Sequence, residues 1–130
     1  MTGLEAAGLY VGLNLLILLV LGTNTSLARR KYKISLGDGD NEEMLCKMRA
    51  HANATEWMPA ALIGLVVLAM MAVPTMIIHV FGLLFTVARG AHGYALGSGD
   101  KSNPGRKIGS ALTLLIYLGM ALALIYYAIL

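Results

Sequence analysis

The chain has 130 residues, of which 58% are hydrophobic and only 13% are charged. Soluble domains carry about 25% charged residues, so the composition predicts a membrane protein and excludes an ordinary soluble enzyme. The net charge of +3 comes with few aromatic side chains and no basic face, which excludes nucleic acid as a partner, and the single cysteine excludes an internal disulfide.

Four apolar segments follow one another along the chain, each of a length suited to crossing a bilayer as a helix. We expect one domain over residues 1–130, with approximate spans at residues 4–27, 53–71, 75–96 and 107–129. The second helix begins earlier, near Glu42, outside the apolar layer. The sequence therefore predicts an all-α fold, a polytopic integral membrane four-helix bundle with up-down-up-down topology.

The connections between these segments carry turn signals. A basic run at residues 29–33 ends the first segment, and a Gly-Asp-Gly-Asp-Asn cluster at residues 37–41 forms a turn. Either Asp40 or Asn41 can cap the second helix. The short turn Ala72–Thr75 makes the second and third segments an antiparallel hairpin.

The basic residues predict the orientation of the chain. All ten Lys and Arg fall in the connection between the first two segments or around the loop between the last two. Neither terminus and no residue of the Ala72–Thr75 turn is basic. The positive-inside rule then places both long connections in the cytoplasm and both termini outside.

Polar residues precede the apolar half of the second segment. Arg49, Asn53 and Glu56 stand at i, i+4 and i+7, so they share one face of a helix. His51 lies about 200° from Arg49 and is not expected on that face. A carboxylate at the edge of an apolar layer is costly without a partner, so Glu56 marks either a ligand site or a structural ion pair with Arg49 or Arg89.

Basic residues of the other three segments reach the same end of the bundle. They are Arg29 and Arg30 on the first, Arg89 with His92 on the third, and Arg106 opening the fourth. Such a site suits a small anionic ligand whose carboxylates face the arginines. Nearby arginine charge would also lower the pKa of a ligand thiol. The histidines lack metal-ligand spacing, so no metal site is predicted.

Three motifs carry a resemblance to a known family. They are RAHANATEWMP at residues 49–59, ARGAH at 88–92 and Pro-Gly-Arg at 104–106. With the four apolar spans, they resemble the MAPEG family, membrane-associated proteins in eicosanoid and glutathione metabolism. The GDGDNEEML stretch resembles small bacterial inner-membrane members. The resemblance covers nearly the whole chain and implies a homotrimer that binds glutathione between subunits, near the cytoplasmic end.

The resemblance also implies roles for individual residues. Glu56 would meet the amino group of glutathione, and Arg106 matches the arginine that stabilises the thiolate. The other positions that would hold the tripeptide are Arg29 or Arg30, Arg49, Asn53, Arg89 and His92, with Tyr94 close to the place of a usual tyrosine. The chain departs from the family pattern at Ala52, Leu96 and Ser110, where an arginine and two tyrosines are usual.

Two functions follow as expectations. The first is a glutathione-dependent transferase or peroxidase that acts on a lipophilic electrophile. The alternative is a non-catalytic binding or structural membrane protein on the same scaffold. A small transporter ranks lowest because the chain shows no inverted repeat. The expected partners are other copies of the chain, membrane lipids, glutathione and a hydrophobic small molecule, in a bacterial inner membrane.

Overall fold

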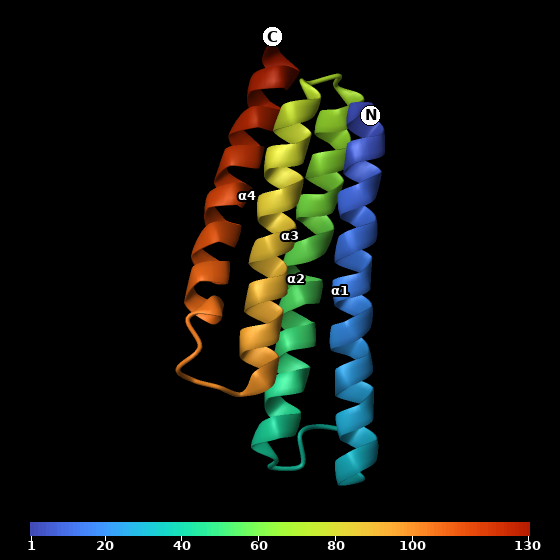
Figure 1. Cartoon of the computed structure of the whole chain (residues 1–130), viewed down its shortest axis with the longest axis vertical. Coiled ribbons are helices and arrows are strands. Elements are labelled where there is room, and N and C mark those ends of the chain that lie inside the picture. The colour runs from blue at the N-terminus through green and yellow to red at the C-terminus, as the bar shows by residue number, and fades with distance from the viewer.

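The computed structural model describes residues 1–130 as four helices joined by loops (Figure 1). The helices are α1 (Gly3–Tyr32), α2 (Glu42–Met70), α3 (Thr75–Ser98) and α4 (Gly105–Ile129). Each is long and apolar enough to cross a membrane. The prediction of an all-helical chain with four candidate membrane helices is therefore confirmed.

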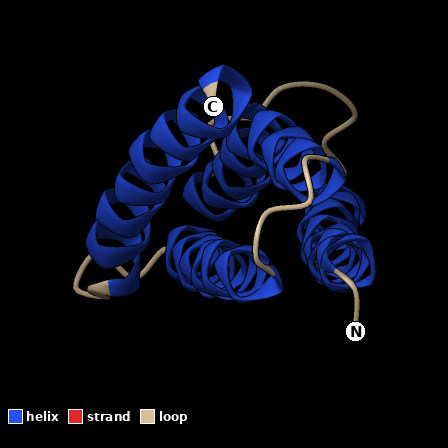
Figure 2. Ribbon diagram, turned by 90° about the horizontal axis from the view of Figure 1, so that it is seen from above, coloured by secondary structure: helices blue, strands red, loops and turns tan.

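The helices alternate in direction, so both termini lie at one end and the α1–α2 and α3–α4 connections lie near the other (Figure 1). The view along the bundle shows helices and loops without a strand (Figure 2). Helices α2 and α3 each contact all of the other three, whereas α1 and α4 do not contact each other. The bundle is consequently open between its first and last helices.

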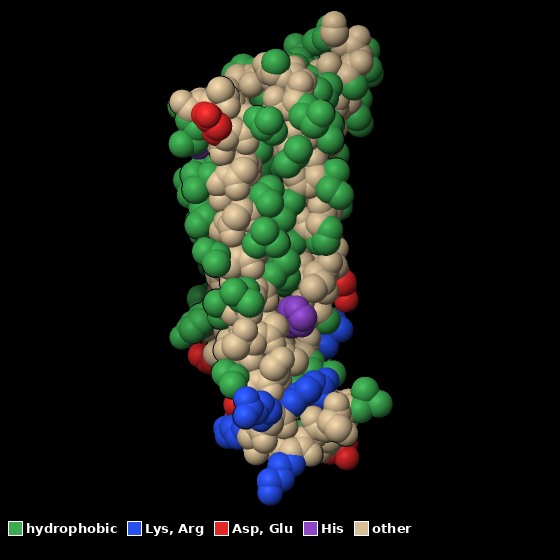
Figure 3. Space-filling view, turned by 90° about the vertical axis from the view of Figure 1, so that its right-hand side faces the viewer, with side chains coloured by type: hydrophobic (Ala, Val, Ile, Leu, Met, Phe, Trp, Pro, Cys, Tyr) green, Lys and Arg blue, Asp and Glu red, His purple; other side chains and the backbone are tan.

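The end that carries the α1–α2 connection projects beyond the rest of the bundle (Figure 1). Helix α1 has 30 residues, about 45 Å at 1.5 Å per residue, which exceeds the ~30 Å of bilayer hydrocarbon. Basic side chains gather at this end, and hydrophobic side chains cover the middle of the face drawn in Figure 3. The loop end therefore extends from the apolar layer into the interface.

Side chains cap the first turns of α1 and α2. Thr2 and Glu5 form a capping box at the start of α1. At the start of α2 the Asn41 side chain accepts a hydrogen bond from the backbone N–H of Met44 at 2.8 Å. Asp40 instead adopts a left-handed backbone with φ of 56°. Of the two residues predicted as possible caps, Asn41 is the one that caps α2.

Helices α1 and α3 are joined by close packing and by hydrogen bonds in the terminal half of the bundle. A Cβ at Gly82 would overlap the ring of Tyr10, so only glycine lets the two helices approach here. The Tyr10 hydroxyl and His79 Nδ1 are hydrogen-bonded at 2.9 Å, and Asn14 Nδ2 donates to Thr86 Oγ1 at 2.8 Å. Such bonds hold helices together where no water competes.

Candidate functional site

A buried arginine lies at the centre of the polar residues between α2, α3 and α4. Only 1% of Arg89 is exposed. Its Nη2 donates to Asn53 Oδ1 at 2.7 Å and lies 3.5 Å from His92 Nδ1, and its Nη1 lies 3.5 Å from Thr113 Oγ1. The buried Nε has no partner. The structure thus brings together Asn53, Arg89 and His92, and it leaves the guanidinium with neutral partners alone.

A small cavity opens beside Arg89. Its volume is 160 Å³, and its lining residues are Asn53, Trp57, Arg89, Ser110, Thr113 and Leu114. Ser110, at which the chain departs from the family pattern, therefore adds a hydroxyl to the same site as Arg89. The cavity is large enough for a small polar group.

Glycines place α4 directly on α3 at the level of this site. A Cβ at Gly109 would lie 2.6 Å from the carbonyl oxygen of Ala88 and 2.8 Å from Cβ of His92. Arg106 precedes Gly109 by one turn, at the exposed start of α4. Asn103 Oδ1 accepts a hydrogen bond from the first N–H of α4, that of Gly105, at 2.9 Å. The N-cap residue Pro104 adds no side-chain bond, so the N–H groups that follow add positive potential next to Arg106. Both features favour an anion at this position.

The structure contains two ion pairs; one ties the last turn of α1 to the start of α2, and the other ties the α3–α4 loop to it. Lys31 Nζ lies 3.2 Å from Glu43 Oε2, and Lys101 Nζ lies 2.8 Å from Glu42 Oε1. Hydrogen bonding to the Glu42 carboxylate raises the pKa of Lys101 above its ordinary value. The carboxylates in the first turn of α2 are thus taken by lysines, and none of the arginines pairs with a carboxylate.

Glu56, Arg49 and Arg106 are all exposed. Glu56 forms no ion pair, so a structural pair with Arg49 or Arg89 within one chain is not what the structure shows. Asn53 turns toward Arg89, whereas Glu56, three residues further on, is presented to the outside. Of the three residues predicted to share a face, Asn53 is therefore the one that the structure brings to Arg89.

The two candidate arginines of α1 differ in their surroundings. Arg29 Nη1 donates to the carbonyl oxygen of Gly37 at 2.9 Å and so holds the α1–α2 loop. Arg30 is exposed and lines a shallow groove between α1 and α2, together with His51. Because α1 does not contact α4, one chain cannot bring Arg30 next to Arg106.

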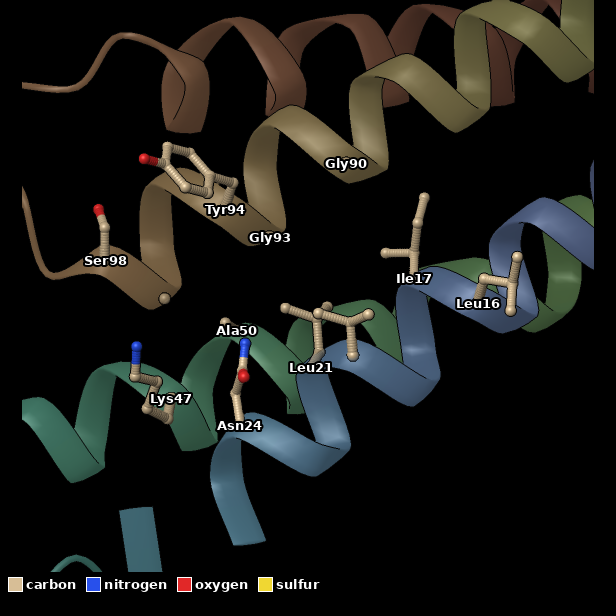
Figure 4. A pocket seen from close by; sticks show the side chains of 12 residues that line it. Leu16, Ile17, Leu21, Asn24, Lys47, Ala50, Gly90, Gly93, Tyr94 and Ser98 are labelled. Atoms are coloured by element: carbon tan, nitrogen blue, oxygen red, sulfur yellow. The ribbon is translucent and has the colours of Figure 1, made fainter. Parts of the chain in front are cut away.

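Tyr94 lies apart from the Arg89 site. Its side chain is 73% exposed. It lines a groove between α1 and α3 (Figure 4), whereas the Arg89 cavity is lined by residues of α2, α3 and α4. Residues 89 and 94 are five positions apart on α3, which corresponds to about 140° around the helix. The structure therefore does not place Tyr94 with Asn53, Arg89 and His92.

Thr113 is a residue of this site that was not predicted from the sequence. This threonine is 2% exposed, and its hydroxyl donates to the carbonyl oxygen of Gly109 at 2.7 Å and faces Arg89. The sequence does contain a signal for this residue, because Gly109 and Thr113 are small residues at i and i+4 on an otherwise apolar helix. A polar residue on such a stripe indicates a partner on the neighbouring helix.

Four apolar helices surround a polar site that is centred on Arg89. These features identify the chain as a helical membrane protein. The chain belongs to the MAPEG family, whose model matches residues 7–126. It is similar to inner membrane protein YecN of Escherichia coli strain K12, with 28% identity over 121 residues, 93% of this chain and 91% of that protein. The YecN protein of Escherichia coli O6:H1 matches equally well. No solved structure matches. The expected resemblance to the family and to its small bacterial members is confirmed.

Proposed function

We propose that this chain is a glutathione-dependent transferase or peroxidase that acts on a lipophilic electrophile within the membrane. The observation that supports this most strongly is the buried Arg89 guanidinium, which lacks a carboxylate partner and whose Nε lacks any partner. Burying an unpaired charge costs several kcal/mol. Such a group is retained most readily where a bound anion offsets the cost.

The chemistry of glutathione matches the charges around this site. The tripeptide carries two carboxylates, one ammonium group and two amides. Arg49 and Arg89 supply cations for the carboxylates, Glu56 supplies a carboxylate for the ammonium, and Asn53 supplies an amide that both donates and accepts. His92 lies beside Arg89 in this site, with its Nδ1 next to the Arg89 Nη2. Tyr94 is left out of the proposed glutathione site because it faces the α1–α3 groove.

We further propose that the site is completed by a neighbouring copy in a homotrimer. Arg30 is exposed on the α1–α2 side and does not reach the residues around Arg89 within its own chain. A second chain whose α1 packs near the exposed Glu56 and Arg106 would bring its Arg30 to them. Arg29, which is bonded to the loop carbonyl of Gly37, is the less suitable of the two arginines.

The reaction requires a stabilised negative charge at the loop end. Bound glutathione would supply a thiol, which in its thiolate form displaces a leaving group from the electrophile. In the peroxidase reaction two glutathione molecules would be oxidised to the disulfide as the hydroperoxide is reduced to an alcohol and water. Arg106 and the N-terminus of α4 provide the positive potential that would hold this thiolate. The apolar helices admit the second substrate from the bilayer. By analogy with YecN, we propose that the protein lies in a bacterial inner membrane. The basic residues of the two long connections support a cytoplasmic position for these connections, with both termini outside.

A non-catalytic binding protein is the second candidate, and the departures from the family pattern favour it. Ala52 carries no charge where an arginine is usual. Leu96 packs against the hydrophobic core where a tyrosine is usual. Ser110 lines the Arg89 cavity with a short hydroxyl in place of a tyrosine. These changes remove contacts to the ligand and leave the scaffold intact, so they are compatible with binding that is not followed by turnover.

Calorimetry and a conjugation assay test both candidates. Glutathione binding is measured by titration in detergent, and conjugation is measured with a generic aryl halide, for the wild type, Glu56→Gln and Arg106→Ala. Lys107→Ala is the matched control, because Lys107 is an exposed cation adjacent to Arg106. We expect Glu56→Gln to weaken binding by about tenfold, the effect of losing roughly 1.4 kcal/mol.

The outcomes separate the candidates. Turnover that Arg106→Ala abolishes and Lys107→Ala preserves supports the enzyme. Glutathione binding without turnover in the wild type supports the non-catalytic protein. A wild type that binds no glutathione in calorimetry would refute both, since both depend on the same charged site.

A further inference from the structure

A second hollow of the molecule lies between α1 and α3 and takes no part in the proposed function. It is a groove of 430 Å³ at the loop-end half of the bundle. This volume lies in the range of about 300–1,000 Å³ that is usual for small-molecule sites. Its lining residues are Leu16, Ile17, Val20, Leu21 and Asn24 of α1, Lys47 and Ala50 of α2, and Gly90, Gly93, Tyr94, Gly97 and Ser98 of α3.

The polar and apolar residues of this groove are segregated along its length. Leucine, isoleucine and valine side chains of α1 and the bare backbone of Gly90 and Gly93 form the part toward the middle of the bundle (Figure 4). Asn24, Lys47 and Ser98 all lie at the end nearest the loops, where the Ser98 hydroxyl is bonded to the carbonyl oxygen of Ala95 (Figure 4). Over the residues from Leu16 to Asn24, α1 covers about 12 Å. The groove is thus an apolar channel with a polar, cationic mouth.

Lys47 is the only charged residue in the groove, and no carboxylate pairs with it. It is half-buried, and the ion pairs of the protein involve other lysines. Lysine at this depth extends its apolar stem along the groove and keeps its ammonium group at the level of lipid headgroups. The cationic mouth is complementary to an anion at that level. The channel behind it is complementary to a hydrocarbon chain.

We propose that the α1–α3 groove binds an anionic phospholipid. One acyl chain lies along the leucine side chains of α1 and over Gly90 and Gly93. The phosphate lies at Lys47, with the Asn24 amide as a hydrogen-bond donor. The Tyr94 hydroxyl, which points toward the loop end (Figure 4), lies at the level at which tyrosines meet headgroups.

The segregation of polarity distinguishes a phospholipid from the other candidate occupants. A helix of a second copy would cover the groove with apolar side chains and leave the Lys47 ammonium facing them. A small uncharged electrophile would form no ion pair with the Lys47 ammonium group. A phospholipid has a polar headgroup followed by an apolar chain, in the same order as the polar and apolar parts of the groove. Phospholipids also surround every membrane helix. Anionic lipids gain about 1 kcal/mol from each lysine or arginine near the membrane surface.

Native mass spectrometry of the full chain in detergent tests the proposal. The wild type is titrated with phosphatidylglycerol or with phosphatidylcholine of the same acyl chains. Lys47→Gln removes the cation, with Lys107→Gln as the control on an exposed lysine. Gly90→Leu is chosen to fill the channel, because the only atom within 4 Å of a Cβ at Gly90 would be Ile17 Cδ1, at 3.8 Å. Gly12→Leu is its control, since nothing lies within 4 Å of a Cβ there.

We expect the wild type to retain phosphatidylglycerol in preference to phosphatidylcholine. Lys47→Gln should lower retention of phosphatidylglycerol about fivefold, the effect of one lysine charge, and Gly90→Leu should lower retention of both lipids. The two control variants should behave as the wild type. Equal retention of both lipids by the wild type, or unchanged retention in Lys47→Gln and Gly90→Leu, would overturn the proposal.

Two further outcomes identify a different occupant. If Gly90→Leu dissociates an oligomer while lipid retention stays the same, a second copy fills the groove and the proposal is wrong. If inorganic phosphate alone binds as tightly as phosphatidylglycerol, the groove is an anion site without a role for the acyl chain, and the proposal is again wrong.

Discussion

Replacing Arg89 by methionine should make the protein more stable and unable to bind glutathione. Arg89 is 1% exposed and has no carboxylate partner. If the charge serves a ligand, the ligand-free protein bears its burial cost without compensation. Methionine has a similar length and an adaptable side chain, so it can occupy the same space without a charge.

The magnitude follows from the contacts that are lost. Replacing buried ionic groups by well-packed apolar ones is often neutral or stabilises by about 1–4 kcal/mol. The bond of 2.7 Å from Arg89 Nη2 to Asn53 Oδ1 is the main loss, and a bond to a charged group contributes about 1.5–3 kcal/mol. Asn53 is half-buried and lines the cavity, so its oxygen keeps access to other donors. The range of about 1–4 kcal/mol is already net of the bonds that are lost, so the expectation is a gain at its lower end, about 1–2 kcal/mol.

Thermal unfolding in detergent measures this effect with and without glutathione. A gain of 1–2 kcal/mol corresponds to a rise in apparent Tm of roughly 3–8 °C. Glutathione at about 100 times its Kd should stabilise the wild type by about 2.7 kcal/mol and leave Arg89→Met unchanged. Asn53→Leu is the informative counterpart. It keeps the buried charge and removes its best acceptor, so it should destabilise by about 1.5–3 kcal/mol.

Opposite results would refute the reasoning. If Arg89→Met loses several kcal/mol, Arg89 holds α2, α3 and α4 together and needs no ligand to explain it. If Arg89→Met still shows the full glutathione-induced rise in Tm, the ligand does not use Arg89.

Three further predictions concern the scaffold. Gly109→Ala should destabilise by about 1–3 kcal/mol, because a Cβ would lie 2.6 Å from the carbonyl oxygen of Ala88, and an unchanged apparent Tm would contradict the close packing of α4 on α3. Asn41→Ala should cost about 1 kcal/mol through loss of the α2 cap, which chemical denaturation detects, whereas Asp40→Ala should cost less. Tyr10→Phe should cost about 0.5–1.5 kcal/mol through loss of the bond to His79, and thermal unfolding that shows no cost would indicate that this bond does not stabilise the fold.

The sequence was sufficient for the helices because the physical signals for them are local. Runs of apolar residues, the turn cluster before Asn41 and the basic run after the first segment act within a few residues of one another. For the N-cap of α2, the sequence left two possible residues, Asp40 and Asn41. The choice between them depended on which backbone became left-handed, and that is a property of the whole loop.

The arrangement of the site could be predicted only in part. Periodicity placed Arg49, Asn53 and Glu56 on one face, but it could not show that Asn53 turns inward to Arg89 while Glu56 remains exposed. That division depends on how α3 and α4 pack against α2. Tyr94 was associated with the site through its nearness in sequence to the place of a usual tyrosine, and the structure places it in another groove.

The way in which α4 is attached has a consequence for biogenesis. Helices α1 to α3 already contact one another without it, and α4 adds only its contacts to α2 and α3. Chains are synthesised from the N-terminus, so a partly made protein presents Asn53 and Arg89 to the membrane before Thr113 and Arg106 exist. During that interval α4 is missing from the helices that surround the Arg89 guanidinium. Docking of the last helix therefore both shields the charge and delivers Arg106, which couples completion of the chain to completion of the site.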